Sequence, residues 1–279
     1  MRELHAGAIT GTVRDMCIRA NCILPSDVRR CIRESYSRED WPPARETLER
    51  ITENYEIAES EGVPICQDTG AACVFIEIGQ DVRVSGDLNE AINEGVRLGY
   101  REGYLRASMV EDPFRRANTG DNTPAVIYYD IVPGDGFKIT VAPKGFGSEN
   151  MSRIAMLSPS DGVEGVKAFI VKAVEEAGSN PCPPIIVGVG IGGTFDKAAL
   201  LAKKALLRPA DDIHPDPWYA ALEQELLESI NSLGIGPQGF GGRTTALAVK
   251  ISAMSTHIAG LPAAVNINCH VARHVSAEL

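Results

Sequence analysis

The chain has 279 residues, of which 44% are apolar, 23% charged and 6% aromatic. This composition excludes a disordered chain, a collagen-like chain and a coiled coil. The net charge is −10 and no basic run is present, so nucleic-acid binding is not expected, because it depends on neutralising phosphates. No segment approaches the roughly 18 apolar residues of a membrane-spanning helix. Charged residues interrupt the first twenty positions, so we expect neither a signal peptide nor a membrane contact, but a cytoplasmic protein.

The first 60 or so residues are predicted to be helical. Apolar residues recur at helical spacing over residues 9–23. Ser26-Asp27 can begin a second helix, and Pro42-Pro43 can begin a third that ends at Gly62. These helices predict a helical N-terminal part over about residues 1–62.

Strands and helices alternate irregularly after residue 62. The strands at 125–132 and 136–142 flank Pro133-Gly134-Asp135, which predicts a hairpin. Residues 245–254 fit either a helix or a strand. The other elements are expected, in chain order, as a strand at 71–78, a helix from Asp87, a helix from Ser160 to about Ala177, a strand at 185–190, helices at 195–207 and 217–232, and a strand at 263–268.

This irregular order favours an α+β or mixed α/β fold over a regular barrel. We expect a helical N-terminal layer packed on mixed sheets. At roughly 150 residues per domain, the length allows one or two domains. Because no linker and no internal repeat stand out, we expect a single domain over residues 1–279, with a mixed α/β body from about residue 63.

Three of the seven cysteines lie in loops rich in Pro, Gly or Asn: Cys66, Cys182 and Cys269. An odd number of cysteines in a cytosolic chain indicates free thiols, metal ligands or catalytic groups rather than a disulfide framework. Rigid loops can direct thiolates at a common centre. The spacings are 116 and 87 residues, and no CxxC pair is present. The residues alone therefore allow either a shared metal centre or three unconnected thiols.

The other four cysteines have a simpler interpretation. Cys17, Cys22 and Cys31 lie in helical patterns, and Cys73 lies in an apolar strand. Buried free cysteine is common, so structural roles are expected for all four. Cys17, Cys22 and Cys31 form a rival ligand set, but their spacing does not place them on one helical face.

Several polar residues could act on a substrate, and each also has a structural interpretation. Asp68 follows Cys66 by two residues and is either an acid–base group or a turn cap. Backbone N–H groups in the segment 144–150 could bind a carboxylate, with Lys144 nearby, or the segment is a plain loop. Arg106 could bind a carboxylate bidentately or lie on the surface. His257 could orient a substrate or be structural.

Residues 188–193 match the pattern G-x-G-x-x-G between a strand and a helix. That context is typical of dinucleotide binding, which makes an NAD-dependent oxidoreductase a remote alternative. However, no second apolar strand ends in an acidic residue, since Asp211 and Asp212 lie in a predicted loop. The other interpretation is a tight turn with close packing between strand and helix.

Taken together, the loop motifs resemble one family, the α subunit of class I fumarate hydratase, and the closely related L(+)-tartrate dehydratase α subunit. The similarity extends from about residue 10 to residue 273. The motifs are CQDTG at 66–70, ANTGDNTPA at 117–125, KGFGSEN at 144–150, NPCPP at 180–184, GVGIGG at 188–193, GGRTTALAVK at 241–250 and THIAGLPAAVNINCH at 256–270.

The resemblance implies a hydro-lyase that reversibly hydrates fumarate to malate with an oxygen-sensitive 4Fe–4S cluster. It implies Cys66, Cys182 and Cys269 as the three cluster ligands, which leaves one iron open as a Lewis acid. Asp68 corresponds to an acid–base residue of the family. The implied substrate contacts are Gln67, Arg106, the backbone near Gly147, and His257.

The resemblance also implies partners. Single-chain members carry a further C-terminal domain, whereas this sequence ends soon after Arg273. We therefore expect a separate β subunit that supplies a second acid–base group and further cationic contacts to a small dicarboxylate. An α–α pair in an α2β2 assembly is implied as well. L(+)-tartrate remains an alternative substrate, and a non-catalytic assembly subunit with structural cysteines remains a third hypothesis.

Overall fold

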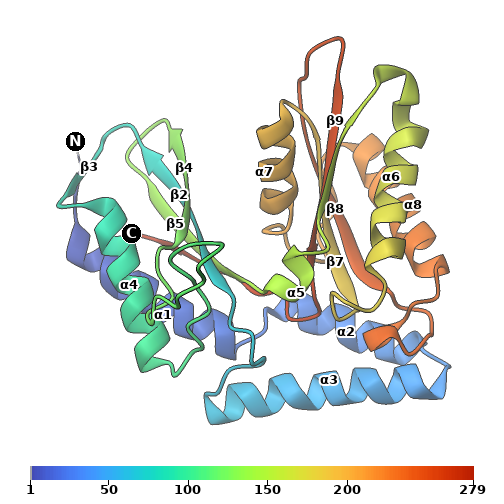
Figure 1. Ribbon diagram of the computed structural model, residues 1–279, viewed down its shortest axis with the longest axis horizontal. Helices are drawn as coiled ribbons and strands as arrows, with labels where there is room; N and C mark the ends of the chain where they lie inside the picture. The colour runs from blue at the N-terminus through green and yellow to red at the C-terminus, as the bar shows by residue number, and fades with distance from the viewer. Residues whose placement is uncertain (1) are drawn as a thin grey trace. The chain divides into compact units, whose positions relative to one another are not determined.

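Helices and mixed sheets make up the structure, a computed structural model that describes residues 2–279 (Figure 1). This confirms the expected α+β class. The chain divides into two compact units, and each is discontinuous in sequence. Unit 1 holds the chain up to Leu24, residues 55–146 and residues 273–279, and unit 2 holds residues 25–54 and 147–272. The expectation of a single domain stays a prediction.

Unit 1 is a four-stranded sheet in the order β10-β5-β2-β4, with α1 and α4 packed on it, and a small parallel pair of β1 and β3. Ile9, Val13 and Met16 of α1 are buried in its core, as their spacing predicts. The bounds are β1 (Arg2–His5), α1 (Ala6–Cys22), β2 (Ala71–Gly79), β3 (Val82–Ser85), α4 (Leu88–Glu102), β4 (Val126–Val132), β5 (Phe137–Lys144) and β10 (Val275–Glu278).

The predicted hairpin of β4 and β5 is wrong. Both strands form at the expected positions, but β2 lies between them, parallel to β4 and antiparallel to β5. Residues 71–76 of β2 are all buried, so the strand needs neighbours on both of its edges and cover on both faces. The Pro133–Asp135 turn instead accepts a hydrogen bond through Gly134 O from Asp81 N, at 3.0 Å.

Unit 2 is a four-stranded sheet in the order β6-β9-β7-β8, with α7 on one face and α6 and α8 on the other (Figure 1). The apolar core lies mainly between the sheet and α6 and α8. The bounds are α2 (Ser26–Arg38), β6 (Arg153–Leu157), α6 (Gly162–Ala177), β7 (Ile185–Gly192), α7 (Phe195–Ala205), α8 (Pro217–Ser232), β8 (Ala246–Met254) and β9 (Leu261–Asn268). Helix α3 (Pro42–Glu61) and the short α5 (Phe146–Glu149) each have residues in both units.

Most predicted bounds agree with the structure to within a few residues. The helix expected from Ser160 begins at Gly162, after a 3-10 turn capped by Ser158, whose N–H donates to Asp161 Oδ2 at 2.8 Å. The ambiguous residues 245–254 are a strand, β8. The short strands β1, β3, β6 and β10 were not expected from the sequence, because four or five residues give too little periodicity to recognise.

The glycines of the G-x-G-x-x-G pattern serve packing. Gly188 and Gly190 lie inside β7, and α7 crosses directly over them. A Cβ on Gly188 would lie 2.2 Å from Ala202 O, and a Cβ on Gly190 would lie 2.0 Å from Ala198 O. Helix backbone therefore occupies the space above both glycines, as the packing interpretation predicts.

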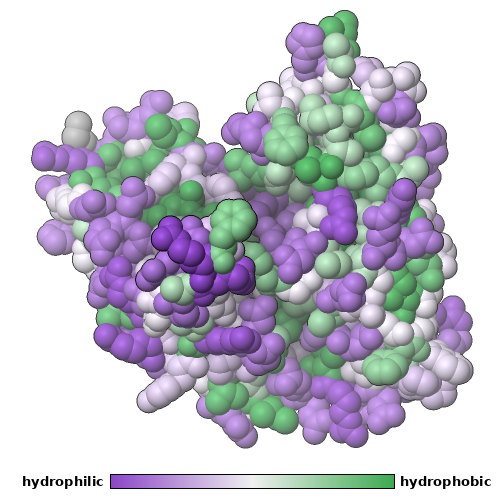
Figure 2. All heavy atoms as spheres, viewed as in Figure 1, coloured by the Kyte–Doolittle hydropathy of each residue, from purple (hydrophilic) through white to green (hydrophobic). Residues whose placement is uncertain are grey.

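Within residues 2–279, no helix combines the length and the apolar character that a membrane crossing requires. On the face that Figure 2 shows, hydrophilic and apolar side chains are interspersed.

Candidate functional site

The loop Cys66–Gly70 in unit 1 is held from inside by buried donors. The carbonyls of residues 68–70 each accept a side-chain hydrogen bond. Arg273 Nη2 donates to Asp68 O at 2.6 Å. The Tyr100 hydroxyl lies 2.8 Å from both Thr69 O and Gly70 O. Asn122 Nδ2 also donates to Gly70 O, at 3.1 Å. The loop therefore has a defined backbone without belonging to a helix or strand.

This backbone fixes the carboxylate of Asp68. Oδ1 accepts the N–H of Gly70 at 3.0 Å, and Oδ2 accepts the N–H of Phe146 at 2.9 Å. Asp68 thus does cap the turn, yet an ionised carboxylate has about four acceptor positions, and donors within residues 2–279 use only two of them. The group is half-buried.

Gln67 and Arg106 lie together on the exposed side of this loop. Arg106 Nη1 donates to Gln67 Oε1 at 2.5 Å. The Arg106 backbone exchanges two hydrogen bonds with Thr69 Oγ1, accepted from Arg106 N at 2.9 Å and donated to Arg106 O at 3.1 Å. The guanidinium, whose planar fork suits a carboxylate, is therefore held against Gln67, the residue before Asp68.

In unit 2 the loops of Cys182 and Cys269 touch. His270 N donates to Cys182 O at 3.3 Å, and His270 Nδ1 lies 3.0 Å from the same oxygen. Gln238 Nε2 donates to Pro183 O at 2.7 Å and lies 3.2 Å from His270 Nδ1. The structure thus brings together the loops of two of the three cysteines that the sequence singles out.

Gly147 lies in unit 2 beside the loop of Cys182, since a Cβ on it would be 3.8 Å from Asn180 O. The segment that follows is anchored to β9, because Asn266 Nδ2 donates to Glu149 Oε2 at 2.7 Å and to Ser152 Oγ at 2.9 Å. Lys144 is buried at the end of β5 in unit 1. It is not an exposed cation for a substrate.

His257 lies apart from the cysteine pair of unit 2. It is exposed in the connection between β8 and β9, whereas Cys269 follows β9. The eight residues of β9 separate the two positions by about 26 Å at the usual rise of a strand. Within unit 2 the structure therefore does not place His257 with Cys269, although both belong to one sequence motif.

Thiol acidity argues against the rival ligand set. Burial raises the pKa of Cys17 to about 12. Burial, helped by the charges of Asp211 and Glu34, raises the pKa of Cys31 to about 11, and burial also raises the pKa of Cys22. Thiolates are the species that bind metals, so these thiols are poor ligands at neutral pH.

The loop cysteines fit an iron–sulfur group by their chemistry. Cys66 and Cys269 are partly exposed, Cys182 is exposed, and none of the three forms a disulfide. Soft thiolate ligands on loops are typical of iron–sulfur clusters. Among residues 2–279, no group of three or more His, Cys, Asp or Glu side chains is placed to hold a metal ion.

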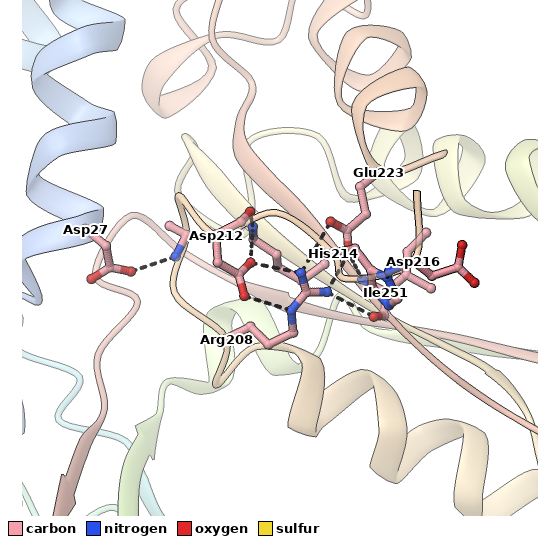
Figure 3. Close-up of polar contacts among 9 residues, drawn as sticks. Asp27, Arg208, Asp212, His214, Asp216, Glu223 and Ile251 are labelled. Carbon is pink, nitrogen blue, oxygen red and sulfur yellow. Dashed lines mark hydrogen bonds and ion pairs between the residues drawn. The ribbon is translucent and has the colours of Figure 1, made fainter. Parts of the chain in front are cut away.

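A charged cluster elsewhere in unit 2 has a structural role (Figure 3). Arg208 Nη1 donates to Glu223 Oε1 at 2.6 Å, and Arg208 Nη2 to Asp212 Oδ1 at 2.8 Å. Glu223 Oε1 also accepts Ile251 N at 2.7 Å, while Arg208 Nη1 donates to Ile251 O at 3.1 Å. Arg208 and Glu223 thus satisfy the backbone N–H and C=O of Ile251 on the outer edge of β8. Without them, this edge would be open to pairing with another strand.

Asp212 is fully engaged in this cluster. Burial alone would raise its pKa, but hydrogen bonds from Arg208 and Lys250 outweigh burial and hold the pKa below the usual range. Lys250 Nζ donates to Asp212 Oδ1 at 2.7 Å. An aspartate committed to two cations does not suit a ribose hydroxyl, which further weakens the dinucleotide alternative.

Sequence reasoning missed the residues that support the site. Tyr100 is one apolar-face residue of α4, and Gln238 is one of several polar residues in a Gly-rich loop. Asn122 lies inside the quoted motif at 117–125, and Arg273 lies three residues after the motif at 256–270, which is the one signal that could have drawn attention to them. Their roles depend on contacts with residues far away in the sequence.

Comparison with known proteins assigns the family. The sequence model described as "Fumarate hydratase (Fumerase)" matches residues 10–278. A Methanocaldococcus jannaschii protein named "Putative L(+)-tartrate dehydratase subunit alpha" is 45% identical over 267 residues, covering 94% of each chain. The protein named L(+)-tartrate dehydratase subunit alpha in Escherichia coli is 33% identical in strain UTI89 and 32% identical in strain K12. Each match covers 96% of this chain and 89% of the relative.

The family match spans nearly all of the chain and includes every loop described above. The chain therefore belongs to the fumarate hydratase (Fumerase) family.

Proposed function

We propose that this chain is the α subunit of a two-subunit iron–sulfur hydro-lyase that reversibly hydrates fumarate to malate. The observation that carries the proposal is the loop Cys66–Gly70. It holds the Asp68 carboxylate by two backbone N–H groups, and the neighbouring residue Gln67 accepts a hydrogen bond from the Arg106 guanidinium. A fixed carboxylate and a carboxylate-binding cation held at one loop are what proton transfer on a dicarboxylate requires.

Cys66, Cys182 and Cys269 are the proposed ligands of a 4Fe–4S cluster. Contact between the Cys182 and Cys269 loops supports this assignment, as does the position of Cys66 two residues before Asp68. With three protein ligands, the bound cluster supplies an open iron as a Lewis acid for the substrate hydroxyl. Burial raises the pKa of the competing thiols Cys17 and Cys31, which disfavours their thiolate forms.

The chain's own residues divide the remaining work. Asp68 takes up or returns a proton at a carboxylate oxygen that its two N–H partners keep in place. Arg106 binds one substrate carboxylate through its fork, and Gln67, held by Arg106, presents its amide beside it. Backbone N–H groups near Gly147 bind the second carboxylate. His257 stays a proposed substrate contact, although β9 separates it from Cys269 within this chain.

A β subunit is the proposed partner, because the relatives are named as α subunits. It would supply a second acid–base group and further cations for the dicarboxylate, with α chains paired in an α2β2 assembly. Seven cysteines without a disulfide suit a reducing compartment, so we propose a cytoplasmic enzyme.

Iron and acid-labile sulfide per chain, measured after anaerobic reconstitution, test the proposal. We expect about four of each in the unmodified chain. Cys66→Ser, Cys182→Ser and Cys269→Ser are each expected to lose most of this iron. Cys31→Ser is the matched control, since Cys31 is as partly exposed as Cys66, and it should keep the iron. No stoichiometric iron in the unmodified chain, or equal iron in all four variants, would refute the cluster assignment.

L(+)-tartrate is a second candidate substrate, favoured by the names of the relatives. Both substrates are dicarboxylates that lose or gain water, so the residues above serve either reaction. Comparing kcat/KM for malate and L(+)-tartrate with the same α–β preparation separates them. The proposal expects malate to be the better substrate.

A further inference from the structure

Arg273 is a buried cation with unused donors. It is only 4% exposed and precedes β10 at the end of unit 1. Nη2 donates to Asp68 O at 2.6 Å. Its Nε and Nη1 atoms are buried and have no hydrogen-bond partner among residues 2–279.

This arrangement is costly for stability. Arginine stays protonated inside a protein, and a buried charge without a full set of partners loses hydration that nothing replaces. Buried polar atoms in native proteins are nearly always paired, so each exception calls for an explanation. Arg208 shows how this chain otherwise handles a partly buried guanidinium, with two carboxylates and a carbonyl around it.

The surroundings of Arg273 indicate what its charge faces. Burial raises the pKa of Cys22, and the positive charge of Arg273 opposes that rise. Burial likewise raises the pKa of Tyr100, again opposed in part by Arg273. Tyr100 is the residue whose hydroxyl lies 2.8 Å from the carbonyl oxygens of both Thr69 and Gly70. The guanidinium therefore lies beneath the loop Cys66–Gly70, on its inner side.

We propose that Arg273 is a positioning residue for Asp68. By fixing the Asp68 carbonyl from below, it keeps the Asp68 carboxylate where Gly70 N and Phe146 N can donate to it, and it places a positive charge under the loop that also bears Cys66. The stability lost by burying an incompletely paired cation is the cost of a preorganised acid–base group. This inference rests on the proposed function of Asp68, but its structural part can be tested alone.

Hydrogen exchange in the metal-free chain is the first test. In Arg273→Met we expect the amides of Gly70 and Phe146 to exchange at least about tenfold faster, because a charge-assisted hydrogen bond no longer fixes the loop. Amides inside β2 should not change. The thermal midpoint should stay the same or rise, since an apolar side chain removes the unpaired charge. Arg273→Lys, which keeps the charge and an N–H donor group, should show a smaller acceleration.

Arg208→Met is the matched control for loss of a partly buried guanidinium. It should lower the thermal midpoint, because two carboxylates and Ile251 O lose their donor. Exchange at Gly70 and Phe146 should stay unchanged in this control.

Two outcomes would overturn the proposal. One is a folded Arg273→Met chain in which Gly70 and Phe146 exchange at the original rate. The other is a lower midpoint with faster exchange across all of unit 1, which would make Arg273 an ordinary structural residue. If Arg273→Met does not fold, Arg273→Lys decides by the same amides: acceleration confined to Gly70 and Phe146 supports the proposal, and unchanged or uniform exchange refutes it.

The α–β enzyme gives an independent readout. In Arg273→Lys and Arg273→Met we expect kcat to fall at least about tenfold, KM to change less than about twofold, and iron content to stay constant. A changed KM with an unchanged kcat would contradict a positioning role. If the unmodified enzyme hydrates no fumarate at all, the proposed function fails, while the exchange experiment still decides whether Arg273 positions Asp68.

Discussion

Gly70 is a glycine for two separate physical reasons. Its φ is +75°, a backbone region that other residues adopt at a cost. A Cβ at this position would also lie 2.7 Å from the backbone carbon of Lys144, closer than real contacts allow. The residue after Thr69 therefore has to be glycine for β5 to approach the loop that holds Asp68.

Replacing Gly70 by alanine should lower the free energy of unfolding by about 3 kcal/mol, from backbone strain together with overpacking. Gly120→Ala is the matched control, because Gly120 has a φ of +80° but no atom within 4 Å of its Cβ position. In Gly120→Ala, backbone strain alone should lower the free energy of unfolding by about 1 kcal/mol. Urea unfolding followed by circular dichroism measures both. If both variants lose the same free energy of unfolding, the close approach of the Lys144 backbone to Gly70 does not contribute to the cost.

At the scale of elements, the charged cluster on β8 replaces a missing strand. Arg208 and Glu223 pair with the backbone of Ile251, and Lys250 and Asp212 complete the charge balance. Hydrogen bonds to charged groups are stronger than neutral ones, so the cluster both stabilises α8 against the sheet and closes its edge.

The cluster predicts an acid-dependent stability. The pKa of Asp212 is lowered in the folded chain, so its contribution is present above the unfolded pKa of about 3.9 and is lost as pH falls through the lower folded value. Asp212→Asn should therefore cost about 2 kcal/mol at pH 7 and progressively less below pH 4. Thermal or urea unfolding across this pH range measures it. If the stability difference between the unmodified chain and Asp212→Asn stays constant down to pH 2, the ionised Asp212 carboxylate is not its source.

At the scale of the whole molecule, the candidate groups are distributed over both units. Cys66, Asp68 and Arg106 belong to unit 1, and Cys182 and Cys269 belong to unit 2. The relatives that match over nearly all of this chain are named as α subunits. Activity is therefore expected to be a property of an assembly rather than of this chain alone.

The reconstituted chain alone should show almost no fumarate hydration, and adding the β subunit should restore it. The physical reason is that hydration needs a second acid–base group and more positive charge than Arg106 supplies to a dianion. Steady-state assays with and without β, at equal iron content, measure the difference. Full activity without β would show that this chain holds the complete catalytic set.

Local patterns were sufficient for most of the fold. Apolar periodicity predicted α1, α2, α3 and α4 with nearly correct bounds, and apolar runs predicted β2, β7 and β9. These features follow from which residues face water and which do not, and that information is local. The same holds for the three loop cysteines, since Pro, Gly and Asn mark their surroundings as loops.

Contacts distant in sequence were decided only by the tertiary structure. Three features are of this kind: the insertion of β2 between β4 and β5, the support of the loop Cys66–Gly70 by Arg273 and Tyr100, and the separation of His257 from Cys269 by β9. A turn signal states that the chain reverses, but the strand that pairs next is chosen by burial of the whole sheet. The sequence by itself thus determined the elements and the reactive groups, whereas packing determined which groups meet and which buried donors hold them.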